Sequence, residues 1–308
     1  MNKPRHIEPG DTVGIVAPSS PITKEQVETG LRMLEERGYK VVLGEHLWER
    51  EGYLAGPDEH RAEDVQRMFA DPTVKAIICA RGGFGATRMM DYLDLEVIAE
   101  NPKVLMGFSD VTFLHLAAQA EADLVSFYGP MLITFSVERP PWVAEQWFRA
   151  METPAPLPPL PVEGKATTIV GGKAEGIVLG GCLSLVASSI GTPWEIDPTE
   201  SLLILEDVDV PQHRVDGTFQ QLKQCGLLAA VEGFVVGEMT RSNEKSEASI
   251  GDKPVEEIVA GHLQGRGVPA VVGLPLGHVP TPLTLPMGIT ARLDADKGTL
   301  TYLESATT

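Results

Sequence analysis

The sequence is short of cysteines, of basic residues and of long apolar runs, and each shortage excludes a class of protein. Its three cysteines, Cys79, Cys182 and Cys225, are far apart and form no Cys-x-x-Cys pair, which disfavours a disulfide framework and a thiolate metal site. Lysine and arginine number 25 against 43 aspartates and glutamates, a formal net charge of −18. Because no basic cluster offsets repulsion by phosphates, we expect no nucleic-acid partner.

The apolar segments are all short. None approaches the roughly 18 apolar residues of a membrane span, and the first ten residues, MNKPRHIEPG, lack the apolar core of a secretory signal. We therefore expect a cytoplasmic protein without a membrane partner. The composition, 43% hydrophobic and 22% charged, is typical of a globular protein, and 308 residues is long for one hydrophobic core. Two domains are the natural expectation.

In the first half, short apolar segments alternate with amphipathic ones. Thr23 and Gln26 have the spacing of a capping box, and apolar residues then recur at helical spacing up to Gly38, a typical helix-ending residue. Because the predicted strands lack a polar face, the alternation indicates a parallel α/β sheet. Periodicity predicts strands at 12–17, 39–43, 74–80, 103–106 and 124–128, and helices at 23–38, 59–70, 86–92, 111–122 and 142–151.

A proline-rich segment divides the chain near its midpoint. Residues 154–161, PAPLPPLP, hold five prolines in eight positions, which predicts an extended, semi-rigid linker. We expect an N-terminal α/β domain at 1–152, the linker at 153–164 and a C-terminal α+β domain at 165–308. The elements predicted in that last part are strands at 176–179, 201–205, 233–236 and 268–273, helices at 183–190, 212–224 and 254–263, and a closing hairpin of 289–293 and 299–303.

Ser109 lies where a predicted strand turns sharply into a predicted helix, two residues after Gly107. On such a turn the backbone N–H groups of the helix start lie close to the hydroxyl, and acyl-transfer enzymes use this arrangement to expose a nucleophile. A serine there can also be a helix N-cap, and Asp110 stands where helix starts favour acidic residues. On the residues alone, both interpretations stay open.

Two more residues are candidates for acid–base chemistry. Glu206 directly follows the apolar run 202–205, where a carboxylate would be partly buried and would need a partner. His278 lies in the proline-flanked loop LPLGHVPTP, which would fix its side chain without needing it for packing. A solvated turn and a structural histidine are the respective alternatives.

The glycine-rich segment Arg81–Gly85, RGGFG, is a possible anion-binding turn. It lacks both the Lys-Ser/Thr of a P-loop and the Gly-x-Gly-x-x-Gly order of a dinucleotide fold. Its glycines suit a turn whose N–H groups point at an anion or oxyanion. A plain strand-to-helix turn is an equal alternative, because glycine is permissive.

The other histidines give no comparable signal. His115 falls six residues after Ser109, on roughly the opposite face of the predicted helix. His46 and His60 lie in polar, surface-like surroundings. No set of histidine, cysteine and aspartate is clustered in the sequence as metal ligands would be.

Taken together, these segments resemble the LD-carboxypeptidase family of serine peptidases, which includes murein tetrapeptide LD-carboxypeptidases and the microcin C self-immunity proteins. The resemblance implies a flavodoxin-like N-terminal domain with a parallel sheet and a C-terminal α+β domain with a barrel-like sheet. The matching stretches occur in family order across nearly the whole chain: 13–20 (VGIVAPSS), 81–85 (RGGFG), 107–110 (GFSD), 180–184 (GGCLS), 205–208 (LEDV) and 277–278 (GH).

The resemblance also implies a catalytic triad, with Ser109 as nucleophile, His278 as general base and then acid, and Glu206 orienting His278. The backbone N–H groups of Gly83 and Asp110 would form the oxyanion hole. Because these residues come from both sides of the linker, we expect the site between the domains.

The implied activity is that of a serine carboxypeptidase that hydrolyses an L,D-peptide bond. It would release terminal D-alanine from murein tetrapeptide in cytoplasmic peptidoglycan recycling, as a homodimer and without a cofactor or a metal. Arg81 favours this subgroup and is a candidate for substrate binding. Trp194 could stack on a nucleotide base, as the alternative activity requires, an amidase that cleaves peptidyl- or aminoacyl-nucleotide conjugates. A third alternative is a non-catalytic protein that only holds a ligand.

Overall fold

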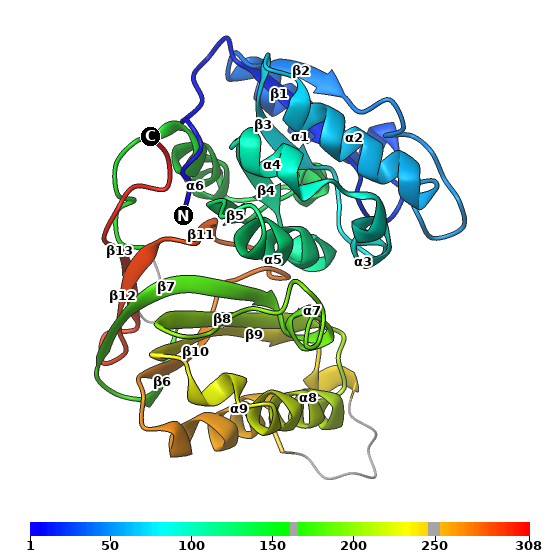
Figure 1. Cartoon of the computed structure of the whole chain (residues 1–308). Coiled ribbons are helices and arrows are strands. Elements are labelled where there is room, and N and C mark those ends of the chain that lie inside the picture. The colour runs from blue at the N-terminus through cyan, green and yellow to red at the C-terminus, as the bar shows by residue number, and fades with distance from the viewer. Residues whose placement is uncertain (161–165, 246–252) are drawn as a thin grey trace. The chain divides into compact units, whose positions relative to one another are not determined.

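The computed structural model describes residues 1–160, 166–245 and 253–308. The chain forms two compact units (Figure 1). Unit 1 comprises Met1–Ala155, Leu283–Gly288 and Ser305–Thr308, and unit 2 comprises Pro156–Pro282 and Ile289–Glu304. Unit 1 therefore includes two late segments that were expected in the C-terminal domain.

Unit 1 is built on a six-stranded sheet in the order β11-β5-β4-β3-β1-β2. Its first five strands in the chain run parallel in the order 2-1-3-4-5, which is the flavodoxin-like arrangement. The sixth, β11, pairs antiparallel with β5 at the edge. The strands are β1 (Thr12–Val16), β2 (Lys40–Leu43), β3 (Val74–Cys79), β4 (Val104–Gly107), β5 (Ser126–Tyr128) and β11 (Leu285–Met287).

The helices of unit 1 begin and end where the local sequence directs. Before α1, the N–H of Thr23 donates to the Gln26 side chain at 3.0 Å, which forms the predicted capping box. After α1, Gly38 has a φ of 97°, as a helix-ending glycine should. The helices are α1 (Lys24–Glu36), α2 (Asp58–Ala70), α3 (Ala86–Met89), α4 (Leu95–Glu100), α5 (Thr112–Ala120) and α6 (Pro141–Glu152).

Unit 2 is built on a seven-stranded mixed sheet in the order β13-β12-β7-β8-β9-β10-β6, which curls as a half-barrel (Figure 1). The four strands β7 to β10 run parallel, and antiparallel neighbours flank them on both sides. The strands are β6 (Thr167–Val170), β7 (Lys173–Cys182), β8 (Ser201–Val208), β9 (Gly233–Thr240), β10 (Ala270–Leu274), β12 (Thr290–Asp294) and β13 (Thr299–Tyr302), and the helices are α7 (Leu183–Ser188), α8 (Gln212–Gln224) and α9 (Val255–Leu263).

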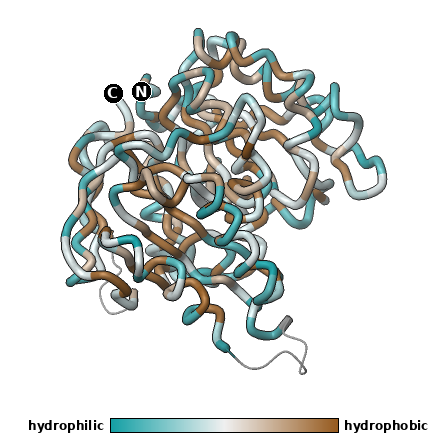
Figure 2. The backbone as a smooth tube through the Cα atoms, turned by 60° about the horizontal axis from the view of Figure 1, so that its bottom comes forward, coloured by the Kyte–Doolittle hydropathy of each residue, from teal (hydrophilic) through white to brown (hydrophobic). Residues whose placement is uncertain are grey.

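Apolar segments of the chain run through the interior of each unit, and polar segments follow the outer turns (Figure 2). Every residue of β4 is buried, as are seven of the eight residues of β8. This burial explains why neither strand has a polar face. No helix in the described residues is both long and apolar enough to cross a membrane.

The predicted fold class is confirmed: a flavodoxin-like parallel sheet in one unit and a curled mixed sheet in the other. The predicted hairpin forms as β12 and β13. Among the α-helices and strands of the described residues, three were not anticipated, namely β6, α4 and β11. In β11, Pro286 has no N–H to donate, which restricts such a strand to a sheet edge.

Most of the proline-rich segment is described. Residues 153–160 form neither helix nor strand, yet Leu157 and Leu160 are buried. The N–H of Leu160 donates to the carbonyl of Leu300 at 3.4 Å, which fixes the segment to unit 2. The remainder of the predicted linker, 161–164, lies outside the described residues.

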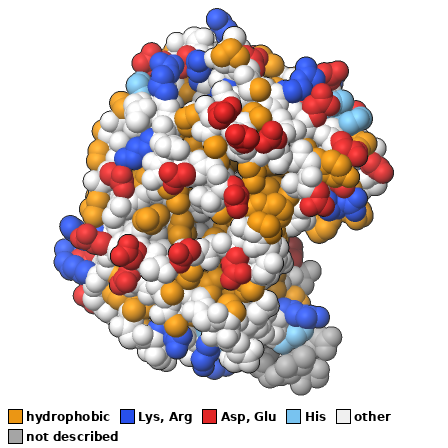
Figure 3. All heavy atoms as spheres, viewed as in Figure 1, with side chains coloured by type: hydrophobic (Ala, Val, Ile, Leu, Met, Phe, Trp, Pro, Cys, Tyr) orange, Lys and Arg blue, Asp and Glu red, His pale blue; other side chains and the backbone are white. Residues whose placement is uncertain are grey.

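Acidic and basic side chains are distributed differently over the surface. On the face drawn in Figure 3, acidic side chains spread over both units, while basic side chains occur in small separate groups. This agrees with the net charge of −18. An anionic ligand would therefore need a local basic group to overcome the surrounding field.

Candidate active site

Ser109 lies on a strained turn at the carboxyl end of β4. Its φ is 64°, a left-handed backbone conformation that is uncommon for a residue with a Cβ. A short 3₁₀ turn, Ser109–Val111, leads directly into α5. Ser109 is half-exposed, whereas its neighbours Phe108 and Asp110 are buried. The turn therefore presents the serine at the edge of the parallel sheet, where α/β proteins bind ligands.

The glycine turn packs directly against this serine. A Cβ on Gly82 would lie 2.9 Å from the Ser109 Cβ, 3.1 Å from its Oγ and 3.4 Å from the backbone nitrogen of Asp110. Gly83 has a φ of 117°, and a Cβ there would lie 2.2 Å from the Ser20 Oγ. Both positions therefore require glycine. The structure thus brings the predicted glycine turn to the predicted serine within unit 1.

Ser20 ties the end of the first motif to the glycine turn. Its N–H donates to the carbonyl of Gly82 at 3.3 Å, and its Oγ accepts from the N–H of Phe84 at 3.2 Å. The two hydrogen bonds hold the backbone of residues 82–84 in place. They explain why the Pro-Ser-Ser sequence after β1 is part of the same site.

The carboxylate of Asp110 has a structural task that the sequence did not reveal. It is 3% exposed and accepts the N–H of Ala86, the first residue of α3, at 2.7 Å. Burial raises the pKa of Asp110, while the bond from Ala86 and the charge of Arg61 act in the opposite direction. The carboxylate therefore joins the Ser109 turn to the helix that follows the glycine turn.

His115 supports the Ser109 turn through a hydrogen bond to the backbone of Gly107. It is fully buried, with Nε2 2.9 Å from the carbonyl of Gly107 and Nδ1 2.8 Å from the Ser126 hydroxyl. Because a carbonyl only accepts, Nε2 carries the proton and Nδ1 accepts from Ser126. Burial lowers the pKa of His115 to about 4, so the ring is neutral. No role was predicted for His115; its one signal is a polar residue inside the apolar helix FLHLAA.

Arg81, the predicted substrate-binding residue, is half-buried beside the glycine turn. One of its guanidinium nitrogens donates to the carbonyl of Pro21 at 3.1 Å. A guanidinium has five N–H groups in a fixed fork, so this contact orients the side chain without using all its donors.

In unit 2, Glu206 and His278 form a hydrogen-bonded pair. Glu206 is 1% exposed, and its Oε2 accepts from the His278 Nδ1 at 2.8 Å and from the backbone N–H of the same residue at 3.2 Å. Since a carboxylate only accepts, Nδ1 carries the ring proton. Burial lowers the pKa of His278, but the charge of Glu206 and its hydrogen bond outweigh this effect and raise it.

Glycine makes this pairing possible. Gly277 has a φ of 61°, and a Cβ there would lie 2.2 Å from the carboxyl carbon of Glu206. A Cβ on Gly237 would lie 3.0 Å from the Cβ atoms of both Glu206 and Leu276. The loop that carries His278 can therefore approach the end of β8 only because Gly237 and Gly277 have no side chains.

The motif at 180–184 supports the neighbouring strand ends. A Cβ on Gly180, whose φ is 116°, would lie 2.1 Å from the carbonyl oxygen of Ile204. The buried carboxylate of Asp207 accepts the N–H of Ser184 at 2.8 Å and its hydroxyl at 2.5 Å. Trp194, the other predicted substrate-binding residue, is half-exposed in the loop after α7.

The predicted site residues thus fall into two groups. Ser109, the glycine turn and Arg81 belong to unit 1, and Glu206, His278 and Trp194 belong to unit 2. Within the described residues, the fold also gathers three side chains that could hold a metal ion, which are His46, Glu49 and His60.

Comparison with known proteins places this chain among the peptidases. A family model for the LD-carboxypeptidase N-terminal domain matches residues 13–129, and a second for the LD-carboxypeptidase C-terminal domain matches residues 175–293. The chain belongs to the LD-carboxypeptidase family, as the six motifs of the sequence suggested.

Relatives with assigned names agree with this placement. A probable murein peptide carboxypeptidase of Bacillus subtilis (strain 168) is 37% identical, over 96% of this chain and 93% of the relative. A murein tetrapeptide carboxypeptidase of Pseudomonas aeruginosa is 30% identical, over 92% and 94%. The solved structure of the microcin C7 self-immunity protein MccF in complex with aspartyl sulfamoyl adenosine has the same fold, with a TM-score of 0.90 over 100% of both chains at 23% identity.

Proposed function

We propose that this protein is a serine-type LD-carboxypeptidase that releases terminal D-alanine from a murein tetrapeptide in peptidoglycan recycling. The observation that carries the proposal is the left-handed backbone of Ser109, with a φ of 64° at the end of β4. Strain of this kind persists where the surrounding structure imposes it, and nucleophile-bearing turns are one such place. The murein-directed names of two relatives support the choice of substrate.

In this mechanism Ser109 attacks the carbonyl carbon of the L,D-peptide bond. His278 accepts the serine proton at Nε2, because Nδ1 already donates to Glu206. Glu206 holds that tautomer and stabilises the imidazolium that forms. The mechanism requires that the two units bring Ser109 within hydrogen-bond reach of His278.

Backbone N–H groups of Gly83 and Asp110 would receive the negative charge that develops on the carbonyl oxygen. Each such donor lowers the barrier by about 3 kcal/mol. The intermediate then collapses, the C–N bond breaks, and the D-alanine amine takes the proton from His278. An acyl-Ser109 remains. Water attacks this ester with His278 again as base, which releases the tripeptide and restores the serine.

We assign the nucleophile and the oxyanion donors to unit 1, and the acid–base pair to unit 2. Arg81 is the proposed partner of the substrate carboxylate. It lies beside the glycine turn and supplies the local positive charge that an anionic peptide needs in a chain of net charge −18.

The test is hydrolysis of murein tetrapeptide to tripeptide. Ser109→Ala should reduce kcat by at least about 10³-fold, because the covalent step is lost. Ser136→Ala, at an exposed serine of the same unit, is the matched control and should retain activity. Full activity of Ser109→Ala would refute the proposed nucleophile, and absence of labelling by a fluorophosphonate probe would favour a ligand-binding protein instead.

A second candidate is an amidase that cleaves peptidyl-nucleotide conjugates. The observation in its favour is the half-exposed indole of Trp194 in the loop after α7, since an exposed aromatic ring can stack on a base. Offering aspartyl sulfamoyl adenosine and murein tetrapeptide to the same preparation separates the two activities. If Trp194→Ala slows only the nucleotide conjugate, the amidase is the better description.

Cytoplasmic location, expected from the sequence, and a homodimer, expected from the family resemblance, remain predictions. Cell fractionation tests the first, and the mass of the purified protein in solution tests the second.

A further inference from the structure

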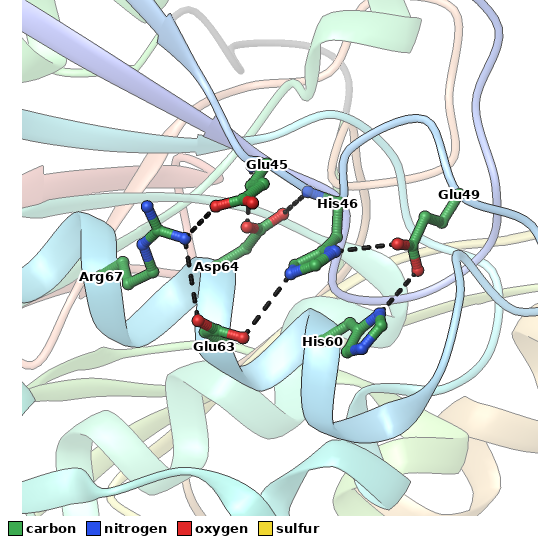
Figure 4. Close-up of polar contacts among 7 residues, drawn as sticks. All are labelled: Glu45, His46, Glu49, His60, Glu63, Asp64 and Arg67. Carbon is green, nitrogen blue, oxygen red and sulfur yellow. Dashed lines mark hydrogen bonds and ion pairs between the residues drawn. The ribbon is translucent and has the colours of Figure 1, made fainter.

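Two histidines and a glutamate meet where the connection after β2 packs against the first turn of α2. The Nδ1 of His46 lies 2.8 Å from one carboxylate oxygen of Glu49, and the Nδ1 of His60 lies 2.9 Å from the other. The two rings stack with centroids 4.1 Å apart. Figure 4 shows both imidazoles directed at the same carboxylate, one from the turn after β2 and one from the first turn of α2.

Hydrogen bonds to Asp64 of α2 fix the backbone of the turn that carries His46. The buried carboxylate of Asp64 accepts the N–H of Glu45 at 2.9 Å and that of His46 at 3.0 Å. A Cβ on Gly44 would lie 2.3 Å from this carboxylate, so glycine allows the close approach. Leu47 is fully buried. His46 therefore occupies a defined position on a rigid turn.

We propose that His46, Glu49 and His60 bind a divalent transition-metal ion, specifically Zn²⁺. One donor atom from each residue lies within 4.8 Å of the other two. Around a tetrahedral zinc ion with bonds of about 2.1 Å, the ligand atoms are about 3.4 Å apart. The donors therefore have to approach one another by about 1.4 Å at most. Two imidazoles and one carboxylate are a typical zinc donor set, with water as the fourth ligand.

Two further charged residues, Glu63 and Arg67, lie next to the three proposed ligands. One carboxylate oxygen of Glu63 lies 3.6 Å from the Nε2 of His46, and the other lies 3.7 Å from a guanidinium nitrogen of Arg67 (Figure 4). Metal-binding histidines typically donate their second N–H to a carboxylate, which fixes the tautomer and strengthens the ligand. At 3.6 Å, Glu63 lies just beyond hydrogen-bond distance of His46 and has to move closer to accept that N–H.

Zinc has to displace the proton from each imidazole nitrogen that it binds. The ion joins the two ends of the 46–60 connection. This role is independent of the proposed peptidase chemistry.

The experiment uses the full chain without an affinity tag, freed of metal by a chelator that is then removed. Zinc is titrated by calorimetry, and Co²⁺ serves as a spectroscopic probe of tetrahedral geometry. We expect one equivalent per chain. Affinity should fall more than about tenfold in His60→Gln and in His46→Gln, and about 10- to 100-fold in Glu63→Gln.

His262→Gln is the matched control, because His262 also pairs with a carboxylate, that of Asp216 at 2.6 Å. It should leave zinc affinity unchanged. His60 is 42% exposed, so its variant decides the question even if His46→Gln fails to fold. Less than one equivalent of bound zinc, or unchanged affinity in the His60 and Glu63 variants, would show that the cluster is only an ion-pair network.

Discussion

Glu206 and His278 are separated by 72 positions in the chain, and their side chains meet at 2.8 Å. The carboxylate is buried at the end of β8, and the imidazole comes from the loop after β10. One carboxylate oxygen binds both the ring and the backbone of His278. The imidazole of His278 is therefore held in one orientation within unit 2, with its Nδ1 toward the carboxylate.

Removing the charge of Glu206 should change how activity depends on pH. Glu206→Gln removes the charge that does most to raise the pKa of His278, so that only the smaller effect of the Asp207 charge opposes the lowering by burial. The acid limb of the kcat/KM profile should move to lower pH, and kcat should fall by about 10⁴-fold because the tautomer is no longer held. Glu232→Gln, at an exposed glutamate of the same unit, should leave the profile in place. An unmoved acid limb in Glu206→Gln would show that His278 is not the titrating base.

The pairing of His278 with Glu206 should also make the free energy of unfolding depend on pH. Because the pKa of folded His278 is raised, its contribution to stability is complete in acid, below the unfolded value of about 6.5. It is lost as the pH rises through the folded pKa. The difference in free energy of unfolding between the native chain and His278→Gln, measured in urea, should therefore shrink with rising pH. A difference that does not change with pH contradicts this linkage.

A methyl group at Gly277 should destabilise unit 2. In Gly277→Ala the new Cβ would lie 2.2 Å from the Glu206 carboxyl carbon, on a backbone with a φ of 61°. We expect a loss of about 1–3 kcal/mol in the free energy of unfolding. Gly217→Ala is the control, since Gly217 is within α8 with open space around it, and it should stabilise by about 0.5–1 kcal/mol. Equal effects of the two substitutions would argue against a clash at Gly277.

Two substitutions at Ser109 separate strain from chemistry. Ser109→Ala and Ser109→Gly both remove the hydroxyl, but only glycine adopts a φ of 64° without cost. Ser109→Gly should be more stable than Ser109→Ala by about 1 kcal/mol, and both should be inactive on murein tetrapeptide. Chemical denaturation of the two purified variants measures the difference. If alanine is the more stable replacement, the turn is not strained in solution.

His115 should make the protein sensitive to acid. Its pKa is lowered to about 4 by burial, so between about pH 6.5 and pH 4 the unfolded chain binds a proton that the folded chain does not. Stability should therefore fall with decreasing pH in this window, by up to about 1.4 kcal/mol per unit. His115→Asn should lose this slope and be less stable at neutral pH. Urea titrations at several pH values compare the two proteins.

The sequence correctly predicted the features that depend on interactions between residues close together in the chain. The capping box of Thr23 and Gln26, the end of α1 at Gly38 and the hairpin of β12 and β13 all depend on residues a few positions apart. In contrast, β11 was missed because a tripeptide centred on Pro286 has no strand pattern of its own. It becomes a strand only by pairing with β5, some 160 residues earlier in the chain.

The candidate site divides in the same way. Ser109 and the glycine turn were visible because strained turns need glycine and small residues at fixed positions, and Glu206 and His278 were proposed through the family motifs. Nothing in the sequence indicated that His115 supports Gly107, nor that His46, Glu49 and His60 share one location. The contact of His115 with Gly107 and that of His60 with Glu49 each join different elements.

By itself, then, the sequence determined the alternation of strands and helices, the two-part organisation, the family and the candidate residues, because all of these are written in spacing and composition. Only the tertiary structure decided which side chains meet. It placed a buried carboxylate against His278, a neutral histidine beneath the Ser109 turn and two imidazoles around Glu49. The physical reason is that burial and hydrogen bonding act through space, so the partner of a buried polar group is set by the packing of distant segments.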